Sequence, residues 1–128
     1  MRTGTITIDG AEHLLCFNAR VIQKGIERFG SMEAFDKAIA GEGGDSQSLD
    51  NSIWILAAMM DAGHKYAIKK GIETGDPMSC DDIYDYVGLD DFAEIQRSIA
   101  QTISDGSSRT VEIETPKNEE TTLVQQED

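Results

Sequence analysis

The chain has few residues that cross-link polypeptides or bind phosphate. Its 128 residues include two cysteines, two prolines and one tryptophan, and 24 Asp and Glu outnumber 11 Lys and Arg, which gives a net charge of −13. The cysteines form no CxxC pair and no disulfide framework, as is typical of a cytosolic protein. The shortage of basic residues argues against binding to nucleic acid or to an anionic membrane, since both depend on clustered Lys and Arg.

Long apolar segments are also missing. The longest apolar run covers residues 53–60, far short of the roughly 20 residues that span a bilayer. The first residues alternate Thr and Ile and do not resemble a secretion signal. The length suits one domain with a core of its own. These absences predict a soluble, acidic, intracellular single domain.

The first residues predict a β-hairpin over 4–17. Residues 5–8 alternate polar and apolar side chains, and Asp9 and Gly10 follow as a favoured two-residue turn. Such a turn places Ile6 opposite His13. Because a lone hairpin is unstable, we expect helices to cover one of its faces.

Helical periodicity predicts four to five helices over about residues 18–105. Asn18 is the expected cap of the first helix and Gly30 its end, while Ser31 begins a short second helix. The glycine-rich residues 41–45 lack the pattern of a phosphate-binding loop and are interpreted as a connector.

The third helix is expected to be the longest, from a cap at Ser48 to about Lys70, where Gly71 ends it. It has a core stripe and a second apolar stripe on another side. Such a helix either lies centrally in the bundle or is covered by a partner on its second side. The second stripe contains Ile55, Met59, Ala62 and Tyr66.

A short acidic helix around Ile83 and a final helix from a cap at Asp90 to Gly106 complete the domain. The expected fold class is mainly α (α+β), with an N-terminal β-hairpin followed by helices. Residues 1–105 would form one globular domain. Residues 106–128 are predicted to be a flexible acidic tail, with a short strand at 111–113.

Trp54 falls in the middle of the polar arc of the third helix, where two interpretations are open. Either the hairpin or another helix folds over it, or it anchors a partner, since Trp is enriched in interface hot spots. The second interpretation gives a predicted partner-binding set of Trp54, Ile55, Met59 and Tyr66.

Residues that could carry chemistry are sparse. His13, Cys16, His64 and Cys80 are residue types that bind zinc, but His13 and Cys16 are three apart on a predicted strand and would point to opposite faces. Residues 73–94 hold eight acids without the order of an EF-hand, and fit solvated helix starts or a docking surface for a basic partner. We predict a non-enzymatic protein with no catalytic residue, no metal and no cofactor.

The order of these features resembles the tail assembly chaperones of long, flexible-tailed bacteriophages and their prophages. The resemblance covers about residues 5–118: the strand pair, NARVIQKGIERFGSMEAF at 18–35, SIWILAAMMDAGHKYA at 52–67, VEIE at 111–114 and PKN at 116–118. AGHKY at 62–66 is its most specific part. The acidic stretch at 73–94 has no counterpart in the family pattern.

The resemblance implies a mostly helical, non-enzymatic protein of the host bacterial cytoplasm that is absent from the mature virion. Members of this family coat the long tape-measure protein, keep it soluble and recruit tail-tube subunits, and some have a longer, frameshifted form. An acidic domain with a surplus apolar stripe suits a partner that exposes a long apolar helix. The oligomeric state stays open, including a homo-oligomer.

Two rival classes also stay open. An acidic DNA-mimic inhibitor would bind a basic host protein through residues 81–94 and the tail, with a steep dependence on salt. A chaperone would instead hold its partner in high salt and lose it when Trp54, Ile55 or Met59 is made polar. A small metal-dependent enzyme would carry stoichiometric metal.

Overall fold

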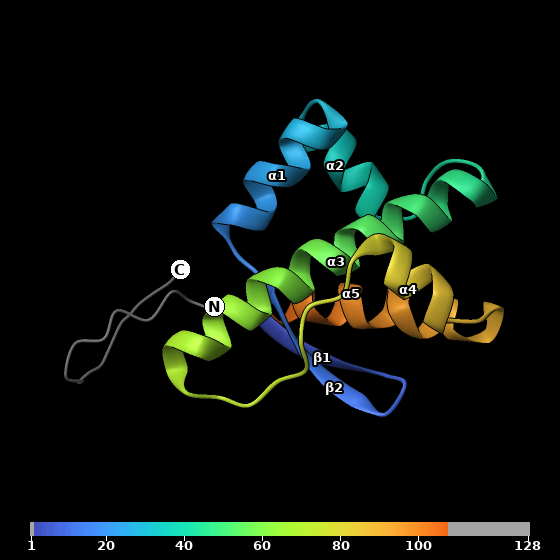
Figure 1. Ribbon diagram of the computed structural model, residues 1–128. Helices are drawn as coiled ribbons and strands as arrows, with labels where there is room; N and C mark the ends of the chain where they lie inside the picture. Colours follow the sequence, from blue (N-terminus) through green and yellow to red (C-terminus); the bar gives the residue numbers. More distant parts are fainter. Residues whose placement is uncertain (1, 108–128) are drawn as a thin grey trace.

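The computed structural model describes residues 2–107, so all but the first two residues of the predicted tail at 106–128, with its strand at 111–113, lie outside the described residues, and residues 106 and 107 belong to the last helix. A two-stranded hairpin followed by five α-helices makes up the described part, which confirms the predicted fold class (Figure 1). The elements are β1 (Arg2–Ile8), β2 (Ala11–Phe17), α1 (Ala19–Phe29), α2 (Met32–Ile39), α3 (Asp45–Lys70), α4 (Cys80–Tyr86), the 3₁₀ turn η1 (Leu89–Asp91) and α5 (Phe92–Ser107).

The hairpin has the predicted two-residue turn. Asp9 and Gly10 have φ angles of 51° and 81°, as a type I′ turn requires. Ile6 therefore lies opposite His13, as predicted. Helix α5 packs on β1 and helix α3 packs on β2, so that the hairpin face containing Ile6 and Leu15 is buried.

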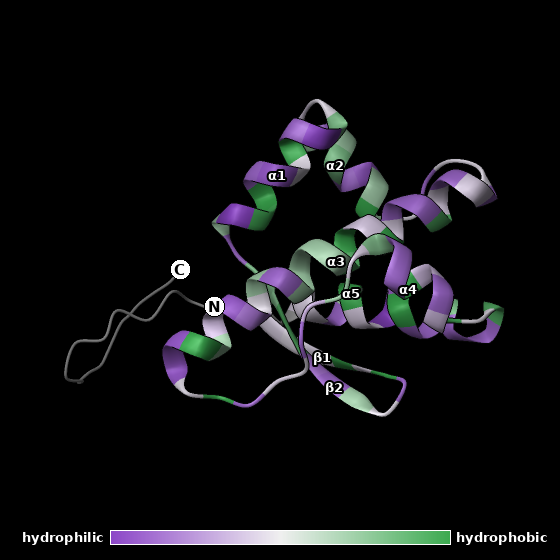
Figure 2. Cartoon of the chain, viewed as in Figure 1, coloured by the Kyte–Doolittle hydropathy of each residue, from purple (hydrophilic) through white to green (hydrophobic). Residues whose placement is uncertain are grey.

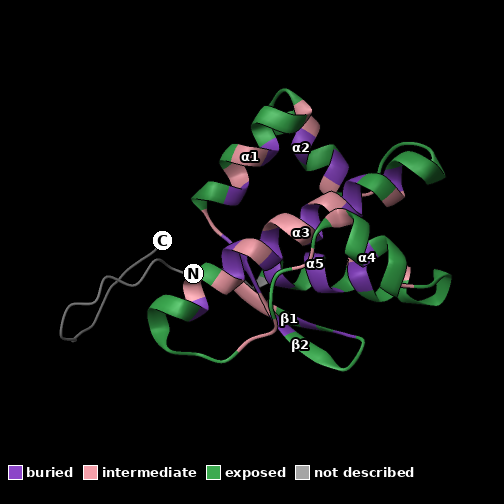
Figure 3. Ribbon diagram, viewed as in Figure 1, coloured by how far each residue is buried: buried purple, intermediate pink, exposed green. Residues whose placement is uncertain are grey.

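Helix α3 runs through the middle of the molecule. Figure 1 shows α1 and α2 along its upper side and the hairpin below it, and α4 and α5 also contact it. The buried positions of α3 are accordingly spread around the helix and not confined to one stripe (Figure 3). The sequence left open whether α3 lies centrally in the bundle or is covered by a partner on its second side, and the structure shows the central position.

Local side-chain contacts set most helix boundaries. The side chains of Asn18, Ser31 and Ser79 each accept a hydrogen bond of 3.1 Å from the backbone N–H three residues further on. Gly30 and Gly71 end α1 and α3 in the left-handed conformation, with φ angles of 100° and 69°. A side-chain Cβ is strained in that conformation, which explains why glycine occupies both positions.

The predicted cap at Ser48 is wrong. Helix α3 begins at Asp45, after Gly44 in an extended conformation, and the N–H of Ser48 already donates to the Gly44 carbonyl at 2.8 Å. The helix starts as soon as the glycine-rich loop ends, because the carboxylate of Asp45 is favoured at the positive end of the helix dipole.

The predicted cap at Asp90 is also wrong. Asp90 lies inside η1, and the carboxylate of the next residue, Asp91, accepts the hydrogen bond from the Gly88 N–H at 2.8 Å. Helix α5 then continues to Ser107, one residue beyond its predicted end at Gly106. A glycine can remain helical at a cost of only about 1 kcal/mol.

The closest approach between elements occurs where α3 crosses β2. A Cβ added at Gly63 would lie 1.9 Å from the carbonyl oxygen of Leu14 and 2.5 Å from its carbonyl carbon. Any larger residue would therefore push the helix away from the strand. Gly63 thus sets how deeply α3 sits on the hairpin.

The linker after α3 is fastened to β2. The Leu14 N–H donates to Thr74 Oγ1 at 2.7 Å, and the Gly75 N–H donates to the Glu12 carbonyl at 2.9 Å. Further on, the Tyr84 hydroxyl of α4 donates to the Asp50 carboxylate of α3. Burial and this hydrogen bond raise the pKa of Tyr84 to about 12.

We expect Gly63→Ala to lower the free energy of unfolding by about 3 kcal/mol, because the new methyl group would overlap the Leu14 carbonyl. Chemical denaturation of the full chain measures this loss. Gly44→Ala is the control, since its methyl group meets nothing within 4 Å. Equal stability of the two variants would show that α3 does not lie this close to β2.

We expect Tyr84 to ionise near pH 12. Asp50→Asn should lower the pKa of Tyr84 towards the ordinary tyrosine value of about 10. The folded-state pKa is raised, so the stability from this contact is fully present below about pH 10 and is lost as the pH rises through about 12. Tyrosinate absorbance measures the ionisation, and Tyr84→Phe assigns the signal. An unchanged titration in Asp50→Asn would contradict the expectation.

Candidate functional site

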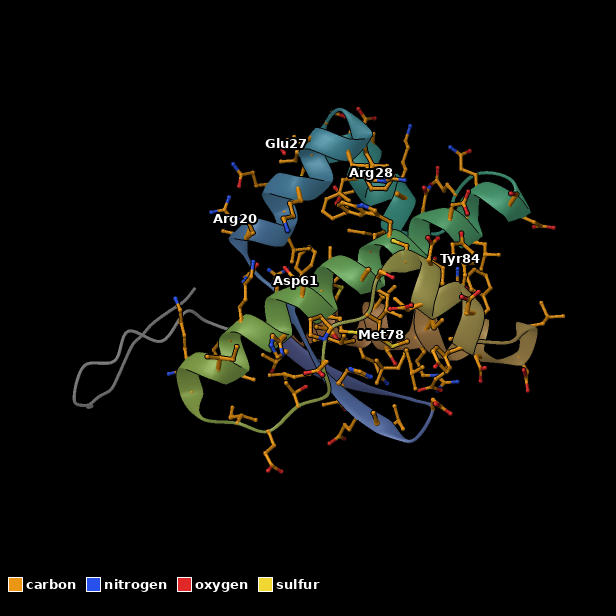
Figure 4. All side chains as sticks on the ribbon, viewed as in Figure 1. Arg20, Glu27, Arg28, Asp61, Met78 and Tyr84 are labelled. Carbon is orange, nitrogen blue, oxygen red and sulfur yellow. The ribbon has the colours of Figure 1, made fainter. Side chains whose placement is uncertain are left out.

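Trp54 is covered by helix α1. Its ring lies edge-on to Phe29, with centroids 5.7 Å apart at 87°, and the Arg28 guanidinium lies 5.2 Å from its centroid. Figure 4 shows Arg28 on the side of α1 that faces α2. Another helix therefore folds over this tryptophan, which agrees with the first of the two interpretations, that the fold itself covers Trp54. The side chain stays half-buried, so a minor part of its surface faces solvent.

Two of the predicted partner-binding residues are not available to a partner. Ile55 and Met59 are 1% and 0% exposed. This first half of the second apolar stripe of α3 is covered by other elements of the same chain, because α3 is surrounded there by helices and the hairpin. The placement of Ile55 and Met59 on a partner-binding surface is therefore wrong.

Tyr66, the fourth predicted residue, does reach a surface groove. It is half-buried, and the Lys70 Nζ lies 5.9 Å from the centroid of its ring. The groove runs between the start of α1 and the second half of α3 and has a volume of about 640 Å³. Its floor is formed by small and apolar side chains, among them Val21, Ala58 and Ala62.

Cationic side chains surround this groove, which we call the basic groove. Lys65, Lys69 and Lys70 come from α3, and Arg20 and Lys24 come from α1. Asp61 is the one carboxylate that lines it; its Oδ2 lies 3.3 Å from Lys65 Nζ and 3.8 Å from Lys24 Nζ. The ion pair between Asp61 and Lys65 was expected from their helical spacing. In Figure 4, Arg20 and Asp61 lie on the same side of the molecule.

A second groove, of about 480 Å³, flanks the other side of the end of α3. Ile68 lines both grooves, and Ile72 lines the second. These two side chains are 67% and 47% exposed. We call Ile68 and Ile72 the α3 ridge. Sequence analysis missed it, although an isoleucine among the lysines of a final helical turn is an unusual signal.

The cysteines are poorly suited to nucleophilic chemistry. Burial raises the pKa of the Cys16 thiol, and burial also raises that of Cys80, with a smaller opposing effect from Arg28. A raised pKa disfavours the thiolate, which is the reactive form. Both thiols are free, as the sequence suggested.

The histidines do not form a metal site with these cysteines. His13 pairs with Ile6 and Cys16 with Thr3, on opposite faces of the hairpin. The Nδ1 atoms of His13 and His64 are buried without a hydrogen-bond partner. Within residues 2–107, no three His, Cys, Asp or Glu side chains gather closely enough to hold a metal ion.

The acids of residues 81–91 lie on α4 and η1, at the opposite end of α3 from the basic groove (Figure 1). All of these carboxylates are exposed, and Asp81 and Asp82 occupy the first turn of α4, where the helix dipole favours them. None of the helices in the described residues combines the length and the apolar character needed to cross a membrane.

We expect Trp54→Ala to lower the free energy of unfolding by about 2 kcal/mol, because it removes the contacts with Phe29 and Arg28. Thermal and chemical denaturation measure the loss. Trp54→Phe is the matched control and should retain most of the stability. A fully stable Trp54→Ala protein would show that this side chain serves a partner and not the fold.

Comparisons with known proteins found no match. No family model, no curated protein and no solved structure matches it. The resemblance to tail assembly chaperones therefore depends on the residues of this chain alone. Its candidate site is the end of α3, where the basic groove and the α3 ridge lie side by side.

Proposed function

We propose that this protein is a tail assembly chaperone of a long, flexible-tailed phage or prophage, and that it binds the tape-measure protein at the end of α3. The observation that supports this binding mode best is the α3 ridge. Ile68 lies between two grooves and Ile72, just after α3, lines the second, while the other apolar side chains of α3 are buried or half-buried.

A tape-measure protein presents long apolar helical surface, and a helix binds a groove through side chains spaced three or four residues apart. The α3 ridge would fit between such side chains, and the two grooves beside it would accept them. The net charge of −13 would then keep the complex soluble and prevent tape-measure chains from associating with one another.

In this proposal the protein acts in the host bacterial cytoplasm and is not retained in the mature virion. Tail-tube subunits are a second set of partners, and neither nucleic acid nor membrane takes part. No catalytic step is involved, in keeping with the raised pKa values of the Cys16 and Cys80 thiols.

The acidic end of the molecule favours one rival function. Exposed carboxylates lie on α4 and η1, whose ribbon is hydrophilic over part of its length (Figure 2), and a basic host protein that binds DNA is the partner that these carboxylates would fit. That complex would depend steeply on salt, because exposed charges are screened. A complex held by an apolar contact at the α3 ridge would not depend steeply on salt.

We expect Ile68→Asp to reduce recovery of the tape-measure protein by about tenfold in pull-downs washed at high salt, because it places a charge at the centre of the apolar contact. Leu89→Asp is the matched control. Leu89 is 93% exposed on η1, at the other end of the molecule, so its replacement should leave recovery unchanged.

Three results would contradict the proposal. Loss of the partner in Leu89→Asp alone would place the binding surface at η1. Equal recovery with both variants would remove the α3 ridge from the interface. Release of a DNA-binding host protein as the salt concentration rises, with no tape-measure protein recovered, would favour the DNA mimic.

A further inference from the structure

The basic groove concentrates positive charge in a strongly acidic protein. Its five cationic side chains are nearly half of the chain's 11 Lys and Arg, and Asp61 is the one carboxylate among its lining residues. Two of the five share that carboxylate, and Lys70 lies over the ring of Tyr66. The residues that line the groove therefore carry a surplus of positive charge.

Helix electrostatics explain only part of this surplus. Lys69 and Lys70 lie in the last turn of α3, where the helix dipole favours cations. Arg20 lies in the first turn of α1, which has no acid and where the dipole disfavours a cation, and Lys24 lies at the middle of α1, where the dipole has little effect. The dipole of α1 therefore does not account for Arg20 and Lys24, and their positions indicate that something outside α1 requires positive charge here.

We propose that the basic groove binds acidic polypeptide, and that its occupant in the free protein is the acidic segment 112–128 of the same chain. Residues 108–128 contain six acids and two bases. Opposite charge is thus available on the same chain. The groove would bind this segment whether or not the protein assists tail assembly.

The end of α5, from which the chain continues to this segment, lies on the same side of the hairpin as the groove. Helix α5 runs antiparallel to β1, because Ile95 lies beside Ile8 and Thr102 lies against Gly4. It therefore ends near the open end of the hairpin, where Arg2 pairs with Phe17. The residue after Phe17 is Asn18, which lines the groove.

The segment is also long enough. Glu112 lies five residues beyond Ser107, so an extended chain carries it up to about 17 Å, and all 21 residues after Ser107 span up to about 70 Å. Because the segment is tethered, its effective concentration at the groove is about millimolar, which compensates for weak individual ion pairs. The acids of α4 and η1 are held at the other end of α3 and could reach the groove only from a second copy.

Carbodiimide coupling of the full chain, followed by mass spectrometry of the isolated monomer, tests the proposal. We expect Lys65, Lys69 and Lys70 to couple to residues 112–128 at least about fivefold more often than Lys37 does, and expect this excess to disappear in about 0.5 M NaCl. Lys37 is a matched control, since its side chain is 59% exposed and that of Lys65 is 66% exposed.

A second measurement uses the full chain with Glu112, Glu114, Glu119 and Glu120 changed to Gln. The backbone amide resonances of the groove residues should shift relative to the unchanged protein, while those around Lys37 should not. Equal coupling of the groove lysines and Lys37, or unshifted groove resonances, would overturn the proposal. Coupling of groove lysines to residues 73–94 in a covalent dimer would overturn it in favour of a second copy.

Discussion

The fold depends on the contact between helix α3 and strand β2 at Gly63. The absence of a side chain there brings the helix axis within reach of the Leu14 carbonyl, so a long helix can lie on a hairpin of only two strands. Once α3 is fixed, β2 and the four other α-helices are each placed by the side of α3 that they cover, and β1 is placed by β2 and α5. Most of the apolar surface of α3 is thereby covered by other elements of the same chain.

This arrangement also decides where a partner can bind. A helix buried along its length leaves only its ends for recognition, and the two ends of α3 differ in character. One end offers the α3 ridge and the basic groove. The other carries the carboxylates of α4 and η1. The acids of residues 81–91, which the family pattern did not explain, thus lie on a surface separate from the proposed binding site, whereas Glu73 of the same stretch lines the second groove.

Features that depend on near neighbours could be predicted from the sequence. The hairpin turn at Asp9 and the caps at Asn18 and Ser31 each involve residues within three positions of each other. Ile55 and Met59 could not be placed, because a helical wheel shows that a stripe is apolar but not what covers it. The same limit hid the basic groove, whose charges come from two helices that are distant in the sequence.

The separation of charge along α3 has a consequence for how the molecule meets others. Asp50 and Lys65 are 15 positions apart on one helix, a distance of about 22 Å, so the domain has a lasting electric dipole along α3. In the field of a charged macromolecule this dipole produces a torque before any contact forms. Near a positively charged partner, the α4 end of the described domain therefore turns towards that partner and the lysine end turns away from it.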